Sequence, residues 1–203
     1  MSLGSTSAAL AIWLVVPVKP LDEGKSRLAA ALSLEERAAL SRRWLLGELR
    51  TAQASSCFAG LAVISRDETV LALAAAQGAV PIRETGEMLN AALEQARHEE
   101  CVAGADALLV LPSDLPLLTV GDLHALVELG AAGAGVVIAP SHDGGTNALL
   151  LRPPHAIPYA FGEGSYARHV ALAAAAGLPC HTYRSDTLAW DVDYPEDLRV
   201  AAL

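Results

Sequence analysis

Short apolar runs alternate along this chain with longer segments that carry helix-boundary signals. The runs predict strands at residues 11–18, 60–64, 79–82, 106–111, 135–140, 148–151 and 179–183. The segments between them predict helices at 33–54, 67–77, 88–103, 120–130 and 165–176, and a short last helix that Pro195 opens. A capping box, Ser33-Leu-Glu-Glu, starts the first helix, while Gly78 and Gly104 end the second and third. This alternation predicts an α/β fold with a largely parallel sheet.

One domain is expected, because 203 residues without a break in composition fit a single core. Residues 1–7, MSLGSTS, are expected to be a flexible leader or a remnant of cloning, so the domain covers 8–203. Hydrophobic residues make up 53% of the chain but aromatic residues only 4%, which predicts a core of alanine, leucine and valine.

Charge and cysteine content narrow the range of partners. A net charge of −9 argues against nucleic acid and against an anionic membrane as a partner. The apolar segment 8–16 follows no basic residue and is too short to span a bilayer. The three cysteines form no CxxC pair, which argues against a disulfide scaffold or a structural zinc site. We therefore expect a protein of the reducing cytoplasm, as a monomer or a homo-oligomer.

Asp114 follows the apolar run at 108–111 directly, within Pro-Ser-Asp-Leu-Pro. Ligands of open α/β sheets bind outside the carboxyl ends of the strands, so a carboxylate here suits a metal or substrate ligand. Pro112 and Pro116 stiffen the loop on both sides, as a metal ligand requires. The alternative is a turn aspartate that bonds its own backbone.

A second acidic cluster lies near the end of the chain. Asp191 and Asp193 alternate about Val192, so an extended backbone would point both carboxylates to one face, where they could share a cation. Helix capping is the alternative, and Glu196 and Asp197 suit the first turn of the last helix in any case. If the two acidic sites meet, they favour a hard divalent cation that carries phosphates.

Residues 15–28, VVPVKPLDEGKSRL, lead from the first strand into a loop with three cations. Gly24-Lys25-Ser26 imitates the end of a P-loop, but Lys19 takes the place of the required first glycine and Pro20 removes an amide. The remaining prediction is a cation cluster of Lys19, Lys25 and Arg27 suited to a nucleoside triphosphate. A solvated basic loop is the alternative.

Two glycine-rich segments could bind an anion. Gly144 and Gly145 precede Thr146 and Asn147 at the start of a strand, where bare backbone can approach a ligand, although a hairpin turn explains the glycines equally well.

In FGEGSYARH, residues 161–169, Gly162, Gly164 and Ser165 could form an anion site at a helix start. Ser165 as a plain N-cap is the alternative. His169 is either an acid or base, or a partly exposed helical histidine.

Six segments, taken in order, resemble the guanylyltransferase family of coenzyme F420 biosynthesis, the phosphoenolpyruvate or 2-phospho-L-lactate guanylyltransferases. They are VPVKPLDEGKSRL, LNAAL, LPSDLPLLT, DGGTNALLL, FGEGSYARH and DVDYPEDL, and they cover the chain from Val15 to Leu198. The resemblance implies a single-domain nucleotidyltransferase fold of the GT-A type, with a mixed, mostly parallel sheet flanked by helices.

The resemblance also implies roles for individual residues. Mg2+ would be held by Asp114, Asp191 and Asp193. The phosphorylated three-carbon acid would be bound by Thr146, Gly162 and Ser165. The nucleotide would be contacted by Lys19, Lys25 and Asn90, and catalysis would depend on Lys25, Arg27 and Asp114. Met88 stands where the family usually has a glycine before Leu-Asn, a difference that could alter base choice.

The implied reaction is attack by the acid's phosphate on the α-phosphorus of GTP, with release of pyrophosphate. Phosphoenolpyruvate is the favoured acceptor, because the Ala- and Leu-rich chain suggests a bacterial source and bacterial members often use it; 2-phospho-L-lactate and 3-phosphoglycerate are the alternatives. A sugar or molybdopterin nucleotidyltransferase and a non-catalytic nucleotide-binding domain are the rival functions. A nicotinamide dehydrogenase is disfavoured, since no GxGxxG follows the first strand.

Overall fold

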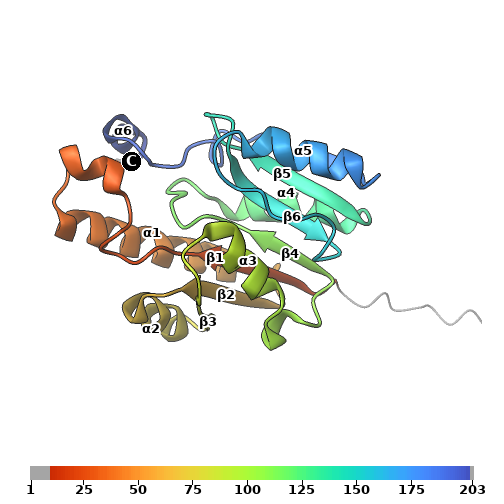
Figure 1. Ribbon diagram of the computed structural model, residues 1–203, viewed down its shortest axis with the longest axis horizontal. Coiled ribbons are helices and arrows are strands. Elements are labelled where there is room, and N and C mark those ends of the chain that lie inside the picture. The colour runs from red at the N-terminus through yellow and green to blue at the C-terminus, as the bar shows by residue number, and fades with distance from the viewer. Residues whose placement is uncertain (1–9, 202–203) are drawn as a thin grey trace, which may run out of the picture.

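A computed structural model describes residues 10–201, and within this range the chain folds around one sheet of seven strands (Figure 1). The strands are β1 (Ile12–Pro17), β2 (Gly60–Ser65), β3 (Val80–Arg83), β4 (Ala107–Val110), β5 (Gly135–Pro140), β6 (Thr146–Arg152) and β7 (Cys180–Thr182). Their order is β3-β2-β1-β4-β6-β5-β7. The leader expected at residues 1–7 lies outside the described residues.

The helices alternate with the strands, as the sequence predicts. They are α1 (Leu34–Ser55), α2 (Glu68–Ala76), α3 (Leu89–Arg97), α4 (Val120–Ala131), α5 (Ser165–Ala175) and α6 (Leu198–Ala201), with short 3-10 turns η1 (Ser26–Ala30), η2 (Glu100–Val102) and η3 (Pro195–Asp197). The predicted capping box of α1 is confirmed, because the Ser33 side chain accepts from the Glu36 amide and Glu36 accepts from the Ser33 amide. None of the described helices is long and apolar enough to cross a membrane.

The helix predicted at 88–103 is broken in two. α3 ends at Arg97, and Glu99 adopts an extended backbone (φ −66°, ψ 143°) before η2 begins. A continuous helix would place Glu99 and Glu100 near its C-terminal end, where the helix dipole disfavours negative charge. The break explains why a purely periodic interpretation overestimates this helix.

β6 makes the sheet mixed. It runs antiparallel to both β4 and β5, whereas the β1–β2, β1–β4, β2–β3 and β5–β7 pairs are parallel. The predicted mixed, mostly parallel sheet is therefore confirmed. Because β6 is reversed, its first residues lie at the same edge of the sheet as the carboxyl ends of β1, β4 and β5.

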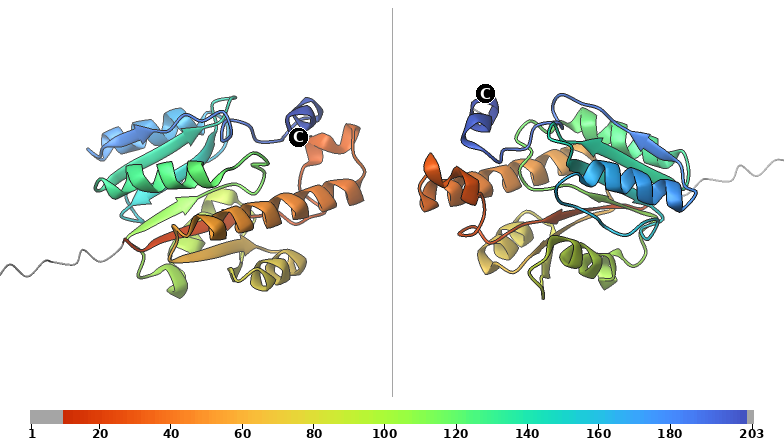
Figure 2. Two further views of the ribbon diagram at one scale, coloured as in Figure 1. Left: turned by 180° about the vertical axis from the view of Figure 1, so that it is seen from behind. Right: turned by 45° about the horizontal axis from the view of Figure 1, so that its top comes forward.

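Helices cover both faces of the sheet. Residues of α1, α2 and α4 pack with one face, whereas α3 and α5 pack with the other, and Figures 1 and 2 show these layers from opposite sides. Side chains of β1 alternate between the two cores, with Leu14 and Val16 on one face and Val15 on the other. The predicted core of alanine, leucine and valine is confirmed on both faces.

Asp122 joins α4 to the segment that leads toward the C-terminal acidic cluster. Its carboxylate accepts from the hydroxyls of Tyr183 at 3.1 Å, Ser185 at 2.6 Å and Thr187 at 2.7 Å. It also completes a capping box with Thr119 at the start of α4. Burial favours the neutral acid, but these donors outweigh burial and lower the Asp122 pKa.

We predict that Asp122→Ala lowers the free energy of unfolding by about 2–3 kcal/mol at pH 7, because it removes a helix cap and leaves buried hydroxyls without their acceptor. A carboxylate with a lowered pKa stabilises the fold above its unfolded pKa, and this contribution is lost as the pH falls through the folded pKa. The difference between variant and wild type should therefore shrink in acid, below about pH 4.

Chemical denaturation at pH 7 and at low pH measures both values. The exposed Asp186, changed to alanine, is the matched control and should have little effect. A difference between Asp122→Ala and wild type that is constant with pH would contradict the assignment.

Candidate metal and phosphate site

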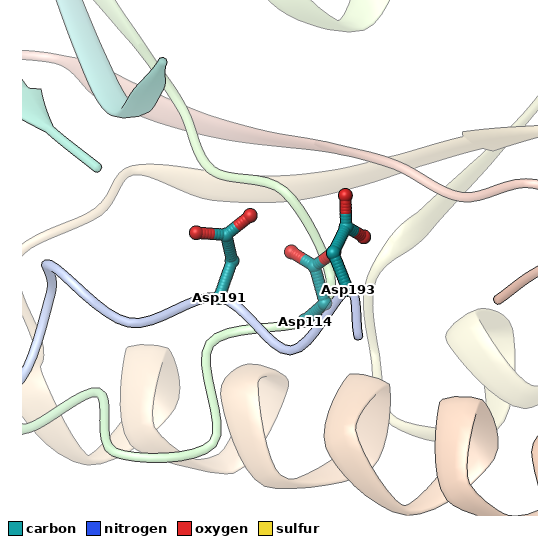
Figure 3. Close-up of side chains that lie close together, drawn as sticks. All are labelled: Asp114, Asp191 and Asp193. Atoms are coloured by element: carbon teal, nitrogen blue, oxygen red, sulfur yellow. The ribbon is translucent and has the colours of Figure 1, made fainter. Parts of the chain in front are cut away.

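Three carboxylates meet at the edge of the sheet where β4 ends. One oxygen each from Asp114, Asp191 and Asp193 lies within 4.8 Å of the other two, and all three side chains are partly buried. Asp114 comes from the loop after β4, while Asp191 and Asp193 come from the tail, which is the segment between β7 and η3. Figure 3 shows the tail crossing the Asp114 loop, with Asp191 and Asp193 on either side of Asp114. The expected meeting of the two acidic segments is confirmed as geometry.

Val192 fixes the tail in this position. Its side chain is fully buried against Leu28 of η1 and Trp44 of α1, and its amide donates to the Asp114 carbonyl at 3.4 Å. Because Val192 points inward, the aspartates on either side of it are directed outward. The period-two interpretation of this segment is therefore correct.

The turn alternative for Asp114 and the capping alternative for Asp193 both fail. Neither carboxylate accepts from a backbone amide among residues 10–201. The start of η3 is instead capped by Asp197, which accepts from the amides of Asp193 at 3.0 Å and Tyr194 at 2.7 Å. The structural role predicted for Asp197 is thus confirmed, and the side chain of Asp193 is left for other partners.

Those partners are the cations of the first loop. The Lys25 ammonium forms an ion pair with Asp114 and lies 3.2 Å from an oxygen of Asp193, whose other oxygen accepts from Arg27 at 2.6 Å. Burial opposes charge on Lys25, but the two carboxylates outweigh it and raise the Lys25 pKa. Lys19 is exposed and has no ion pair within the described part of the chain. The loop is therefore more than a solvated basic segment, although Lys19 stands apart.

The loop is not a P-loop, as the sequence indicates. The amides of Glu23 and Gly24 both donate to the Pro20 carbonyl, at 3.0 and 2.9 Å, so they are not directed at a ligand. The backbone turns at Lys25, which has a left-handed conformation with φ 55°. This turn directs the Lys25 side chain to the aspartates.

The carboxylate cluster has unsatisfied acceptor capacity. The buried Oδ1 of Asp114 has no hydrogen-bond partner among the described residues. Burial first, and then the neighbouring Asp114 charge, raises the pKa of Asp191, while the Asn147 side-chain amide donates to its carboxylate at 3.2 Å. An orphaned carboxylate oxygen between two further carboxylates fits a cation with oxygen ligands.

Sequence reasoning missed Glu48, which lies on the inward face of α1. It is buried, and neither of its carboxyl oxygens has a partner among residues 10–201. Burial first, and the Asp114 charge second, raise its pKa well above the usual range. The available signal was an acid at a position of α1 between the buried Leu45 and Ala52, where an apolar residue is expected.

The second predicted group assembles on the other side of β6. The Thr146 hydroxyl lies 3.0 Å from the Ser165 hydroxyl and 3.1 Å from Nδ1 of His169, and all three residues are buried. Gly164 is the N-cap of α5, so the interpretation of Ser165 as an N-cap is wrong. His169 is completely buried, which overturns the expectation of a partly exposed histidine. Gly162 has φ 123°, a conformation that favours glycine.

The amides at the start of α5 are partly used within the protein. The Ser165 amide donates to Gly162 at 3.0 Å, and the Tyr166 amide donates to Gly144 at 3.3 Å. Gly144 has φ 88° in the turn between β5 and β6, so the hairpin interpretation of the glycines is correct. The hairpin and α5 therefore hold each other in place around Thr146.

Asn90 holds the segment that contains Gly162. Its side-chain amide donates to the Phe161 carbonyl at 3.2 Å, and its oxygen accepts from the Phe161 amide at 2.8 Å. Met88, the N-cap of α3, is 72% exposed. The first turn of α3 thus contacts the Gly162 segment, which the sequence does not reveal.

A cavity of about 820 Å³ lies elsewhere, between the 20–23 loop, the start of α1 and residues 66–69. Five acidic and two basic side chains line it, and none of the three clustered aspartates does. This excess of negative charge is unsuited to a polyphosphate. The clustered aspartates with Lys25 and Arg27 are the better candidate site.

Similar proteins share both sequence and fold. A phosphoenolpyruvate guanylyltransferase of Rubrobacter xylanophilus is 42% identical over 190 residues, which are 93% of this chain and 92% of the relative. A 2-phospho-L-lactate guanylyltransferase of Methanothermobacter thermautotrophicus is 40% identical over 185 residues, 91% of this chain and 81% of the relative.

Solved structures support the fold alone, because their identities are low. A crystal structure from Desulfovibrio desulfuricans G20, assigned to the nucleotide-diphospho-sugar transferases, has a TM-score of 0.76 at 20% identity and covers 93% of this chain and 85% of that chain. CMP:2-keto-3-deoxy-manno-octonic acid synthetase with CTP has a TM-score of 0.65 at 16% identity, with 95% and 97% covered. The predicted nucleotidyltransferase fold is confirmed.

The family itself follows from a match over nearly the whole chain. Residues 12–202 match the family described as guanylyl transferase, CofC like. This stretch contains the acidic cluster, the cation loop and the Thr146 group, so the resemblance inferred from six short segments is confirmed. The chain belongs to the CofC-like guanylyl transferase family.

Proposed function

We propose that this protein transfers the guanylyl group of GTP to phosphoenolpyruvate, giving enolpyruvoyl-diphospho-guanosine and pyrophosphate in coenzyme F420 biosynthesis. The observation that carries the proposal is the cluster of Asp114, Asp191 and Asp193 beside Lys25 and Arg27 in a CofC-like guanylyl transferase. The three cysteines are unpaired, in keeping with a reaction in the reducing cytoplasm.

The three aspartates would hold Mg2+. Their donors are all carboxylate oxygens, which this hard cation prefers, and the partnerless Oδ1 of Asp114 provides a free acceptor. When bound, Mg2+ supplies positive charge that orients the triphosphate and offsets the charge of the leaving pyrophosphate. The stiff Asp114 loop and the buried Val192 keep the carboxylates together before any substrate arrives.

Lys25 and Arg27 would act on the nucleotide phosphates. Both are already held at the edge of the acidic cluster, so their charges lie where two polyanionic reactants must meet. Lys25 keeps its proton because of Asp114 and Asp193, and a charged ammonium can offset the negative charge that grows on the leaving group. Lys19, exposed near the same loop, would contribute a weaker, longer-range attraction.

The acid substrate would bind beside Thr146, Gly162 and Ser165. An ionised phosphate oxygen of the acid forms a bond to the α-phosphorus, and the bond from the α-phosphorus to the pyrophosphate oxygen breaks. No protein nucleophile is needed, and no general base is needed, because the attacking phosphate is already ionised at neutral pH. The residues only have to position like-charged reactants.

Asn90 would contribute through the same segment. Both polar ends of its side chain bond to Phe161, next to Gly162. We propose that Asn90 lies near the nucleotide and positions Gly162 on the acid side, because it stands in the first turn of α3, which follows the exposed Met88.

The first prediction concerns the acceptor. Purified protein with GTP and Mg2+ should release pyrophosphate with phosphoenolpyruvate in preference to 2-phospho-L-lactate or 3-phosphoglycerate, with the product identified by its mass. The curated relatives are named for the first two acids, and small differences in shape decide between such substrates. Turnover with sugar phosphates but with none of the three acids would establish the rival sugar nucleotidyltransferase function.

The second prediction concerns Asp114. Asp114→Asn replaces a charged carboxylate, the proposed metal ligand, with a neutral amide of similar size. We therefore expect kcat to fall about 100- to 1,000-fold while the melting temperature stays close to that of wild type. Asp186→Asn, at an exposed position outside the site, is the control and should keep wild-type turnover. Unchanged turnover in Asp114→Asn would support a non-catalytic nucleotide-binding domain instead.

The third prediction separates two roles of Lys25. Lys25→Met should lower kcat about 100-fold, because the charge that offsets the leaving group is lost. The Mg2+ concentration needed for half-maximal turnover should not rise, because Lys25 pairs with Asp114 and Asp193 and its loss removes a cation that competes with Mg2+ for them. Arg50→Met, on an exposed face of α1, is the control. A Lys25→Met variant that recovers full activity at high Mg2+ would show that Lys25 only holds the aspartates.

A further inference from the structure

A buried hydrogen-bonded chain links the backbone of Ala160 to the Thr146 hydroxyl through His169. The Ala160 amide donates to Nε2 of His169 at 3.0 Å, and Nδ1 of the same ring lies 3.1 Å from the Thr146 hydroxyl oxygen. His169 is completely buried, and Thr146 is nearly so. Both ring nitrogens therefore have one partner each.

The Ala160 amide decides where the imidazole proton lies. A backbone N–H can only donate, so Nε2 must offer its lone pair and carry no proton. A neutral imidazole then has its proton on Nδ1, which donates to Thr146. An imidazolium would set two N–H groups against each other at Ala160. Burial first, and the charge of Arg168 second, lower the His169 pKa to about 4, so the ring is neutral at neutral pH.

The ring cannot easily change this arrangement. The Phe161 ring packs against it edge-on, with 5.0 Å between the ring centroids. Phe161 is in turn fixed at both backbone polar atoms by Asn90. Arg168 of α5 donates to the Ala160 carbonyl at 3.0 Å and so holds the same backbone segment in place. The ring position and its tautomer are fixed together.

The Thr146 oxygen then receives two donors. One is Nδ1–H of His169, and the other is the Ser165 hydroxyl at 3.0 Å. A hydroxyl oxygen has two lone pairs, so both are occupied. The Thr146 hydroxyl proton must therefore point to a further acceptor, and no atom of residues 10–201 accepts a hydrogen bond from it. Thr146 is thus left as a donor without an acceptor, at the edge of the sheet near the proposed acid site.

We propose that His169 is a positioning residue that fixes the Thr146 hydroxyl as a hydrogen-bond donor to an anionic oxygen of the acid substrate. This inference rests on the proposed function and adds a selection rule to it. A site whose hydroxyl can only donate favours a group that can only accept, such as the ionised carboxylate or the fully ionised phosphate of the acid. A substrate group that presents a proton at this point would be disfavoured.

The tautomer can be tested without any turnover. In 15N-labelled protein, two-bond nitrogen–proton correlations should show His169 neutral, with the proton on Nδ1, between about pH 6 and 8. The signals are assigned by their loss in His169→Gln. A proton on Nε2, or titration near pH 6.5, would overturn the inference whether or not the protein is an enzyme.

Kinetics test the effect on Thr146. In His169→Gln the side-chain oxygen can still accept from Ala160, but the donor to Thr146 is lost. In His169→Asn the amide can replace the Nδ1 donor. We expect His169→Gln to raise KM for the phosphorylated acid about tenfold, with KM for GTP unchanged, and His169→Asn to restore part of the loss. His181→Gln, at an exposed position in β7, is the control.

A double-mutant cycle distinguishes positioning from general packing. If His169 acts through Thr146, Thr146→Val combined with His169→Gln should raise KM for the acid no further than Thr146→Val alone. Additive effects, equal losses for GTP and acid, or a wild-type KM in His169→Gln would each overturn the inference.

Loss of the proposed function gives a different result, namely a wild-type protein that turns over none of the three acids. The tautomer measurement then decides the hydrogen-bond arrangement alone. If His169→Gln does not fold, the tautomer in wild type and the KM of His169→Asn still decide the outcome.

Discussion

Mutual repulsion among Asp114, Asp191 and Asp193 is the constraint around which this structure is arranged. Carboxylates within 4.8 Å of one another destabilise the fold unless cations or protons compensate them. The fold responds in two ways: Lys25 and Arg27 supply positive charge, and burial with a nearby charge raises the pKa of Asp191. A bound metal ion would replace part of the positive charge that Lys25 and Arg27 supply to the aspartates. The same charges would therefore affect both the stability of the fold and the binding of substrates.

Packing remote from the aspartates keeps them in place. Val192 anchors the tail in a small core with Leu28 and Trp44, and Asp122 holds the preceding segment through three hydroxyl groups. Asp197 then fixes the backbone just after the cluster. Each attachment comes from a different element, so the geometry of the acidic cluster depends on the whole domain and not on one loop.

Local patterns in the sequence predict the strands, most of the helices and the two acidic segments. Asp114 could be identified because it follows a strand directly, and Asp191 with Asp193 because alternate residues of an extended segment share a face. The break after Arg97 was missed, since the cost of glutamates at a helix end does not alter the apolar pattern. Glu48 was missed because its neighbours are brought to it by the tertiary fold.

The contacts that hold Thr146 and Asn90 in place could not be predicted, because they form between segments distant in the sequence. Asn90 bonds Phe161, which is 71 residues away in the sequence, and Thr146 meets His169 across 23 residues. Glycines and serines of the 161–169 motif are compatible with a cap, a turn or a ligand site, and only the packing of α5 against the hairpin separates these.

The reversed direction of β6 has a consequence for how such a site can diversify. Its first residues, Thr146 and Asn147, lie beyond the ladder with β4, which begins at Leu149, and beside a register irregularity in the pairing with β5. The connection from β6 to α5, residues 153–164, is held to α3 and α5 through Ile157, Ala160 and Phe161. Thr146 is therefore kept in place largely by its contacts with α5, so a change in this connection would move the proposed acid-binding side of the site without altering the strands.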